Sequence, residues 1–119
     1  MDFLTTITGF GDLYEEFLEE KMVIVFNDGA PPELAELAMT HTRADMQQPI
    51  KVGDEVVFGA KTFTVTAVGE EANSTLRDLG HCSFMFNGLP EAELPGQVEL
   101  AGDGVPEVAV GDKFEIHFK

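Results

Sequence analysis

The sequence predicts an all-β protein, a small antiparallel β-barrel of about seven strands with two or three short connecting helices. The stretch 62–68 alternates strictly between apolar and threonine side chains, as a half-buried strand does. The stretches 82–86 and 114–118 repeat that alternation with phenylalanines on one face, and turns containing glycine separate such runs at short intervals. Many short strands favour a closed barrel or a sandwich, because both architectures protect sheet edges.

The first half of the chain mixes strand and helix patterns. Residues 2–9 are rich in threonine and apolar side chains and end at Gly9, which indicates a first strand. Asp12 starts a capping-box-like sequence with Glu15, which predicts a short amphipathic helix with an acidic outer face. A buried strand is expected over 22–26, a short helix after Pro31 and Pro32 through residue 37, and a strand over 38–43.

The second half is predominantly β. Strands are expected over 56–58, 62–68, 82–86, 98–100 and 114–118, and a helix over 72–79 with Asn73 or Ser74 as its cap. Gly80 is expected to end that helix. The tripeptide Val-Gly-Asp occurs at 52–54 and at 110–112, each time just before a strand, which indicates the same turn used twice.

Length and charge limit the classes of function. The 119 residues predict a single domain, 1–119, around one core. Twenty-two acidic against seven basic residues give a net charge of −15, which opposes nucleic acid or an anionic membrane surface and favours a basic protein partner, or serves solubility alone. A lone Cys82, with neither a signal-peptide pattern nor a long apolar run, predicts a cytoplasmic protein that does not insert into the membrane.

His41 is the residue whose setting points most directly to chemistry. In a strand, Met39, His41 and Arg43 would share one face, which would put a nucleophilic imidazole beside a guanidinium. A neutral imidazole can attack phosphorus or carbon, and the cation could hold phosphoryl oxygens. A structural histidine within a strand is the alternative, and this stretch alone favours that alternative.

An ordered set of segments resembles a known family. The runs are Val65-Thr66-Ala67-Val68-Gly69, Leu76-Arg77-Asp78-Leu79-Gly80-His81, Phe86-Asn87-Gly88-Leu89 and Glu91-Ala92-Glu93-Leu94-Pro95-Gly96, together with the strand 22–26 and Gly29-Ala30-Pro31. They resemble the glucitol/sorbitol-specific IIA component of the bacterial phosphoenolpyruvate-dependent sugar phosphotransferase system. The likeness covers nearly the whole chain, although no single tetrapeptide decides it.

The resemblance implies a phosphocarrier. In that family the IIA component accepts a phosphoryl group on a histidine from phospho-HPr and passes it to a cysteine of the IIB component, while the sugar binds the membrane IIC part. The position that matches the family's phosphorylated histidine is His41. His81 and Arg43, with the hydroxyls of Thr40 and Thr42, are the expected supporting groups, and the pairing of Arg43 with a phosphoryl group rests on charge alone.

The other two histidines and the function of the chain have alternative interpretations. His81 could instead interact with the negative end of the preceding helix dipole, and His117 is expected at the surface. The three histidines and Cys82 show no metal-ligand spacing and no glycine-rich phosphate loop is present, so neither a metal nor a cofactor is expected. The rival function is a non-catalytic acidic binding or regulatory module, and a homo-oligomer would form if an apolar barrel edge stayed open.

Overall fold

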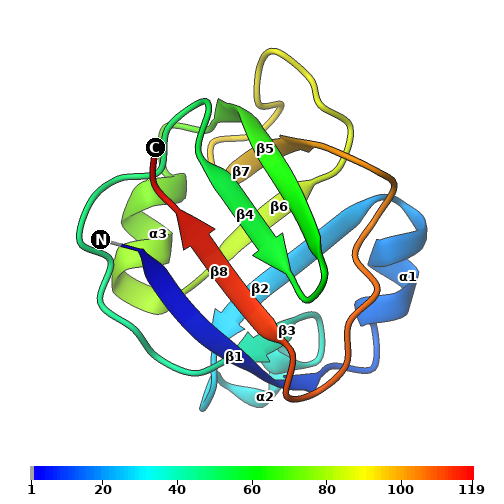
Figure 1. The fold of residues 1–119 in the computed structure, drawn as a ribbon. Coiled ribbons are helices and arrows are strands. Elements are labelled where there is room, and N and C mark those ends of the chain that lie inside the picture. Colours follow the sequence, from blue (N-terminus) through cyan, green and yellow to red (C-terminus); the bar gives the residue numbers. More distant parts are fainter. Residues whose placement is uncertain (1) are drawn as a thin grey trace.

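The computed structural model describes residues 2–119, which form a closed eight-stranded barrel with three short helices (Figure 1). Around the barrel the strands follow the order β1-β3-β2-β6-β7-β5-β4-β8, and β8 pairs with β1 to close it. The predicted barrel is therefore confirmed, and the sandwich is excluded. The elements are β1 (Phe3–Phe10), α1 (Tyr14–Glu19), β2 (Met22–Asn27), α2 (Pro32–Ala35), β3 (Met39–His41), β4 (Glu55–Phe58), β5 (Lys61–Val68), α3 (Ala72–Leu79), β6 (Cys82–Met85), β7 (Gln97–Ala101) and β8 (Lys113–His117).

The barrel departs from the expected all-antiparallel pairing at two places. β2 lies parallel to β3, and β6 lies parallel to β7, while the other pairings are antiparallel. Parallel neighbours need a connection that carries the chain back to the starting end. The connection between β2 and β3 contains α2, and this crossover brings the end of β3 beside the end of β2.

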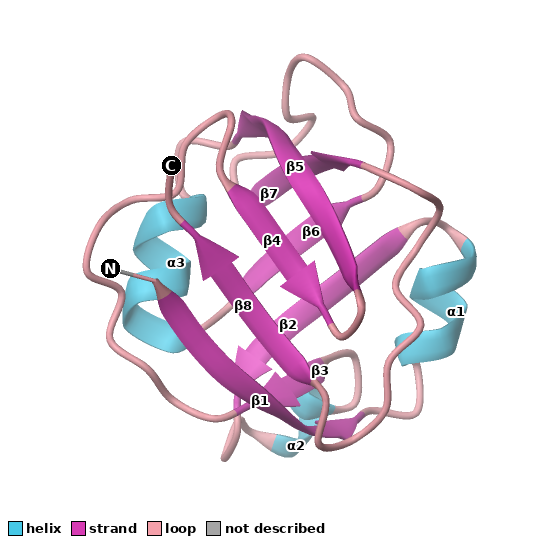
Figure 2. Cartoon of the chain, in the orientation of Figure 1, coloured by secondary structure: helices cyan, strands magenta, loops and turns pink. Residues whose placement is uncertain are grey.

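The three helices flank the barrel rather than cross it (Figure 2). α1 packs against β2, and α3 packs against β6. The predicted span of α3 is confirmed, but its expected cap is wrong: Glu71 occupies the N-cap, and the side chain of Asn73 instead bonds the backbone of Ile50. α1 likewise has Leu13 at its N-cap with no side-chain cap, so the capping box expected from Asp12 does not form.

The core is dominated by phenylalanine rings that contact one another inside the barrel. Phe58 stacks on Phe114 with ring centroids 5.2 Å apart, and Phe84 meets both rings edge to face. Such offset and edge-to-face contacts add to the stability that burial of the rings provides. The predicted inward face of β5 is confirmed, because Phe63, Val65 and Ala67 are buried while the alternating threonines are half-buried or exposed.

The repeated Val-Gly-Asp turns are built alike. In each turn the glycine has a positive φ, 98° at Gly53 and 97° at Gly111. In each, a carboxylate oxygen of the aspartate accepts the N–H three residues earlier at 2.9 Å, from Lys51 to Asp54 and from Ala109 to Asp112. The predicted repetition of turn chemistry is confirmed, and it launches the neighbouring strands β4 and β8.

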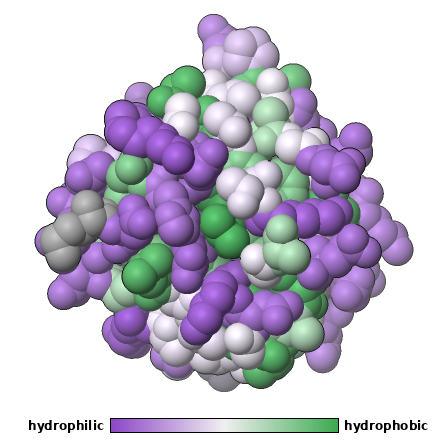
Figure 3. All heavy atoms as spheres, in the orientation of Figure 1, coloured by the Kyte–Doolittle hydropathy of each residue, from purple (hydrophilic) through white to green (hydrophobic). Residues whose placement is uncertain are grey.

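The surface is strongly polar. On the face in Figure 3, hydrophilic side chains surround hydrophobic patches that are small and separate from one another. Among residues 2–119, no helix has the length and apolar character that a membrane crossing would require.

Candidate functional site

His41 is the last residue of β3, and the strand directs its side chain into the barrel. It pairs with Ile7 of β1 on one side and with Asn27 of β2 on the other. Alternation along the strand turns Met39 and His41 inward, and both are completely buried. The imidazole continues the phenylalanine core, with its ring centroid 5.0 Å from that of Phe114 and 6.1 Å from that of Phe3.

Both ring nitrogens of His41 face backbone carbonyl oxygens. Nδ1 lies 2.8 Å from the oxygen of Thr42, and Nε2 lies 2.9 Å from the oxygen of Gly80. A carbonyl oxygen can only accept, so both contacts are hydrogen bonds only in the imidazolium form. Burial nevertheless lowers the pKa of His41, and the two carbonyls and the charge of Asp28 offset this only in part. The neutral imidazole therefore presents one lone pair to a carbonyl, and that contact is unfavourable.

Gly80, which supplies one of these carbonyls, lies where a side chain does not fit. It ends α3 in the left-handed conformation with φ 63°, as the sequence predicts for a terminating glycine. A Cβ there would lie 2.1 Å from Oδ1 of Asn27 and 2.9 Å from Cε1 of His41. The end of α3, the end of β2 and the His41 ring are thus in direct contact.

His81 follows Gly80 and has a different environment. It is half-buried, its ring centroid lies 4.9 Å from that of Phe26, and its Nδ1 is 3.1 Å from the carbonyl oxygen of Val25. That carbonyl accepts a hydrogen bond from an N–H at Nδ1, so the neutral form of the ring would have its lone pair on Nε2. Within the described chain, 2–119, Nε2 of His81 makes no hydrogen bond. An imidazole with one uncommitted nitrogen therefore follows, in the chain, the glycine whose carbonyl contacts His41.

The side chains expected to support His41 from its own strand have other partners in this structure. β3 ends at His41, so the expectation that Arg43 shares its face is wrong: Arg43 is exposed, with Nη2 3.5 Å from the carbonyl oxygen of Asp28. Thr40 and Thr42 are both engaged with β1. The hydroxyl of Thr8 donates to Oγ1 of Thr40, and Oγ1 of Thr42 accepts the N–H of Thr6.

Both ring nitrogens of the third histidine, His117, contact carboxylates. Nδ1 of His117 lies 3.0 Å from Oδ2 of Asp2, and Nε2 lies 2.9 Å from Oε1 of Glu115. Both nitrogens are paired near the surface, where the sequence predicts this residue. No group of three or more histidine, cysteine or acidic residues in the part of the chain that the structure describes could hold a metal ion.

Sequence reasoning missed two polar residues beside this cluster, Asn27 and Arg77. Together with Arg43 they line a hollow of about 290 Å³, whose other lining residues are Ala44, Asp45 and Asp78. A usable signal was present, since Arg43 and Arg77 are the two arginines of a chain with a net charge of −15.

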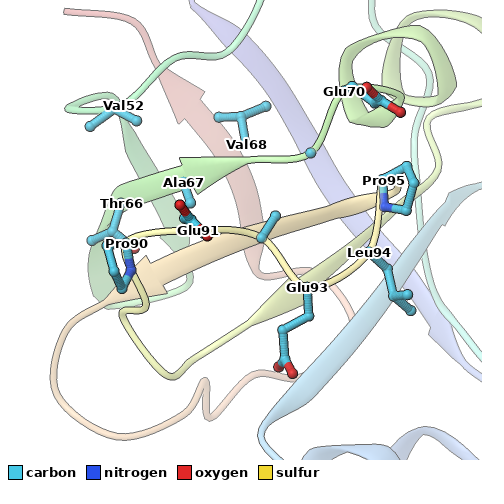
Figure 4. A pocket seen from close by; sticks show the side chains of 12 residues that line it. Val52, Thr66, Ala67, Val68, Glu70, Pro90, Glu91, Glu93, Leu94 and Pro95 are labelled. Atoms are coloured by element: carbon cyan, nitrogen blue, oxygen red, sulfur yellow. The ribbon is translucent and has the colours of Figure 1, made fainter.

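A larger hollow of about 490 Å³ lies away from the histidines (Figure 4). Its lining comes from the end of β5 and the loop 90–95, with Val52 at one side. Its charged lining residues are Glu70, Glu91 and Glu93, with no basic residue among them. Such a lining repels a phosphoryl group, so this hollow is not a phosphoryl site.

Comparison with known proteins identifies the family. The model of the PTS system glucitol/sorbitol-specific IIA component family matches residues 2–115. Proteins named PTS system glucitol/sorbitol-specific EIIA component from Shigella flexneri and Escherichia coli (strain K12) are each 39% identical over 113 residues, which cover 93% of this chain and 92% of the relative. A crystal structure of the PTS system IIA component from Enterococcus faecalis V583 has a TM-score of 0.84 and 27% identity, and the match covers 97% of this chain and 98% of that one. The chain belongs to the family of glucitol/sorbitol-specific IIA components of the phosphotransferase system.

Proposed function

We propose that this protein is a cytoplasmic phosphocarrier for glucitol/sorbitol uptake. It takes a phosphoryl group from phospho-HPr onto His41 and passes it to a cysteine of the IIB component, which serves the membrane IIC component. Family membership supports the relay, since it implies a phosphotransferase component. One observation supports the choice of His41: each of its ring nitrogens faces a backbone carbonyl, while burial lowers the pKa of the ring.

The protonation of His41 follows from the chain connections of the two carbonyls. Thr42 is the next residue, so its carbonyl is held close to Nδ1 by the chain itself. Gly80 is 39 residues away, at the junction between α3 and β6. We assign the proton to Nδ1, where the fixed carbonyl accepts it, and the lone pair to Nε2. Nε2 is then a nucleophile held against a carbonyl that repels it.

The transfer exchanges one N–P bond for another. The lone pair of His41 Nε2 attacks the phosphorus carried by the donor imidazole. The donor N–P bond breaks, and its electron pair returns to the donor nitrogen. In the second step a thiolate of the IIB component attacks the same phosphorus, an S–P bond forms, and the pair of the breaking N–P bond returns to Nε2. Little covalent work falls to the surrounding protein, which positions groups and balances charge.

His41 can react only after the Gly80 carbonyl has moved, because that carbonyl faces Nε2 and the ring is completely buried. A rotation of the peptide between Gly80 and His81 removes the repelling oxygen and opens Nε2 to the outside. Glycine permits such a rotation more readily than any other residue. His81 would then lie beside the phosphoryl group, where an N–H at Nε2 could donate to its oxygens when the ring is protonated.

The test is phosphorylation by phosphoenolpyruvate, enzyme I and HPr, followed by intact mass. The parent is compared with His41→Gln and His81→Gln, and His117→Gln serves as the control because His117 lies at the surface between carboxylates. We expect one acid-labile phosphoryl group on the parent and the control, and none on His41→Gln. Loss only in His81→Gln would transfer the acceptor role to His81, whose Nε2 is uncommitted. A parent that takes no phosphoryl group would refute the relay and favour the binding module.

A further inference from the structure

Both arginines of the chain line one hollow, although they are 34 residues apart. Arg43 lies two residues after the end of β3, and Arg77 lies in the last turn of α3. The remaining five cations are lysines, and none of them lines this hollow. Two guanidinium groups therefore meet at one place on a protein that is otherwise strongly acidic.

The hollow lies next to the histidines. Asn27, which lines it, is paired with His41 across β2 and β3, and its Oδ1 lies beside Gly80. An adjoining hollow of about 320 Å³ shares Asn27, Arg43 and Asp78, and it adds Leu79 and Phe26, the ring that contacts His81. The two arginines thus share a hollow with Asn27, the residue whose side chain lies beside Gly80 and the His41 ring.

Among residues 2–119, only some of the N–H donors of Arg43 and Arg77 have partners. Arg77 is paired with Asp78 at 3.0 Å, with both side chains largely exposed. The hydrogen bond from Arg43 to the carbonyl of Asp28, at 3.5 Å, is long and weak. Guanidinium groups bind phosphoryl oxygens through paired N–H donors, so two of them suit a phosphoryl dianion.

We propose that Arg43, Arg77 and the side-chain amide of Asn27 form the site that holds the phosphoryl oxygens while the group is on the histidine. This inference rests on the proposed phosphocarrier function and adds Arg77 and Asn27 to it. Asp45 and Asp78 also line the hollow, and their charges weaken the hold on the dianion. A weakened hold suits a carrier, because the group must leave for the next protein.

The first experiment measures transfer from phospho-HPr in a single turnover. Arg43→Gln and Arg77→Gln are compared with Lys21→Gln, which makes the same charge change at the opposite end of β2, roughly 20 Å from Asn27. We expect each arginine variant to transfer about 10- to 100-fold more slowly, as loss of a charge-assisted hydrogen bond does. The Lys21 control should stay within about twofold of the parent, and all three should keep the parent's urea midpoint. Arginine variants that match Lys21→Gln, with a parent that is phosphorylated normally, would overturn this inference and leave the proposed function standing.

The second experiment does not depend on the relay. Inorganic phosphate is titrated into the unmodified protein while the Nε–H signals of both arginines are followed by NMR, with sodium chloride as the ionic-strength control. We expect phosphate to shift both signals more than chloride does, and the shift of Arg43 to shrink in Arg77→Gln. Equal shifts in phosphate and chloride would overturn the site, whether or not the parent accepts a phosphoryl group.

Discussion

Replacement of Gly80 by alanine tests the packing at the junction of α3, β2 and β3. The residue has φ 63°, and an L side chain in that conformation costs about 1–2 kcal/mol. The added Cβ would also lie 2.1 Å from Oδ1 of Asn27 and 2.9 Å from Cε1 of His41. Overpacking of this kind costs about 1–3 kcal/mol more, because the amide and the ring must both shift. We expect Gly80→Ala to lower the free energy of unfolding by about 2–5 kcal/mol.

Gly53→Ala provides a matched control. Gly53 also has a positive φ, 98°, but nothing lies within 4 Å of its ideal Cβ, so the variant should lose only the conformational part. Urea denaturation of both variants separates the two contributions, and Gly80→Ala should lower the midpoint by roughly 1–2 M. Equal losses in the two variants would show that the close approach to Asn27 and His41 carries no cost, and the account of the junction would be wrong.

Three other predictions concern buried ionisable groups. The pKa of Asp54 is lowered, because hydrogen bonds from Lys119 and Lys51 to its carboxylate outweigh the opposing effect of burial. Asp54→Asn should therefore lower the free energy of unfolding by about 1–3 kcal/mol at neutral pH. This loss should fade as the pH drops through the lowered pKa, which urea midpoints at several pH values would measure. Burial raises the pKa of Glu99, whose Oε2 has no partner among residues 2–119. As the pH rises from 4.5, Glu99 loses its proton in the unfolded chain before it does so in the folded protein, so the stability of the fold falls until the pH passes the raised pKa. Urea midpoints measured across this pH range should fall less in Glu99→Gln than in the parent. Burial also raises the pKa of the Cys82 thiol, so a thiol reagent should react with it only after urea unfolds the protein, and rapid labelling of the native protein would contradict its placement.

Local patterns were sufficient to predict most of the barrel. Alternation identified the inward faces of β5 and β6, and Gly80 marked the end of α3, because each signal depends on residues close together in the chain. The parallel pairings of β2 with β3 and of β6 with β7 depend on how distant segments meet, and no local period encodes that. Asn73 was misread for the same reason, since its amide serves Ile50 rather than its own helix.

The functional cluster was only partly predictable. The family resemblance pointed to His41 and His81, and the structure brings both to Gly80, whose carbonyl contacts His41 and which precedes His81 in the chain. The burial of His41 was not predicted, because three alternating residues do not show whether a strand face points into the barrel. Arg77 was marked in the sequence only by being one of two arginines, since its proximity to Arg43 arises where α3 and β3 both end.

The position of β8 between β1 and β4 has a consequence for how the protein forms. The strand β8 joins β1 to β4 (Figure 1). At Ile116 it pairs with Phe3 of β1 along one edge and with Val56 of β4 along the other. Before β8 docks, β1 and β4 each expose an edge that can recruit strands from other chains. Folding should therefore be governed by this long-range closure, slow for a chain of this size, and a nascent chain that stalls before residue 113 should aggregate more readily than the finished barrel.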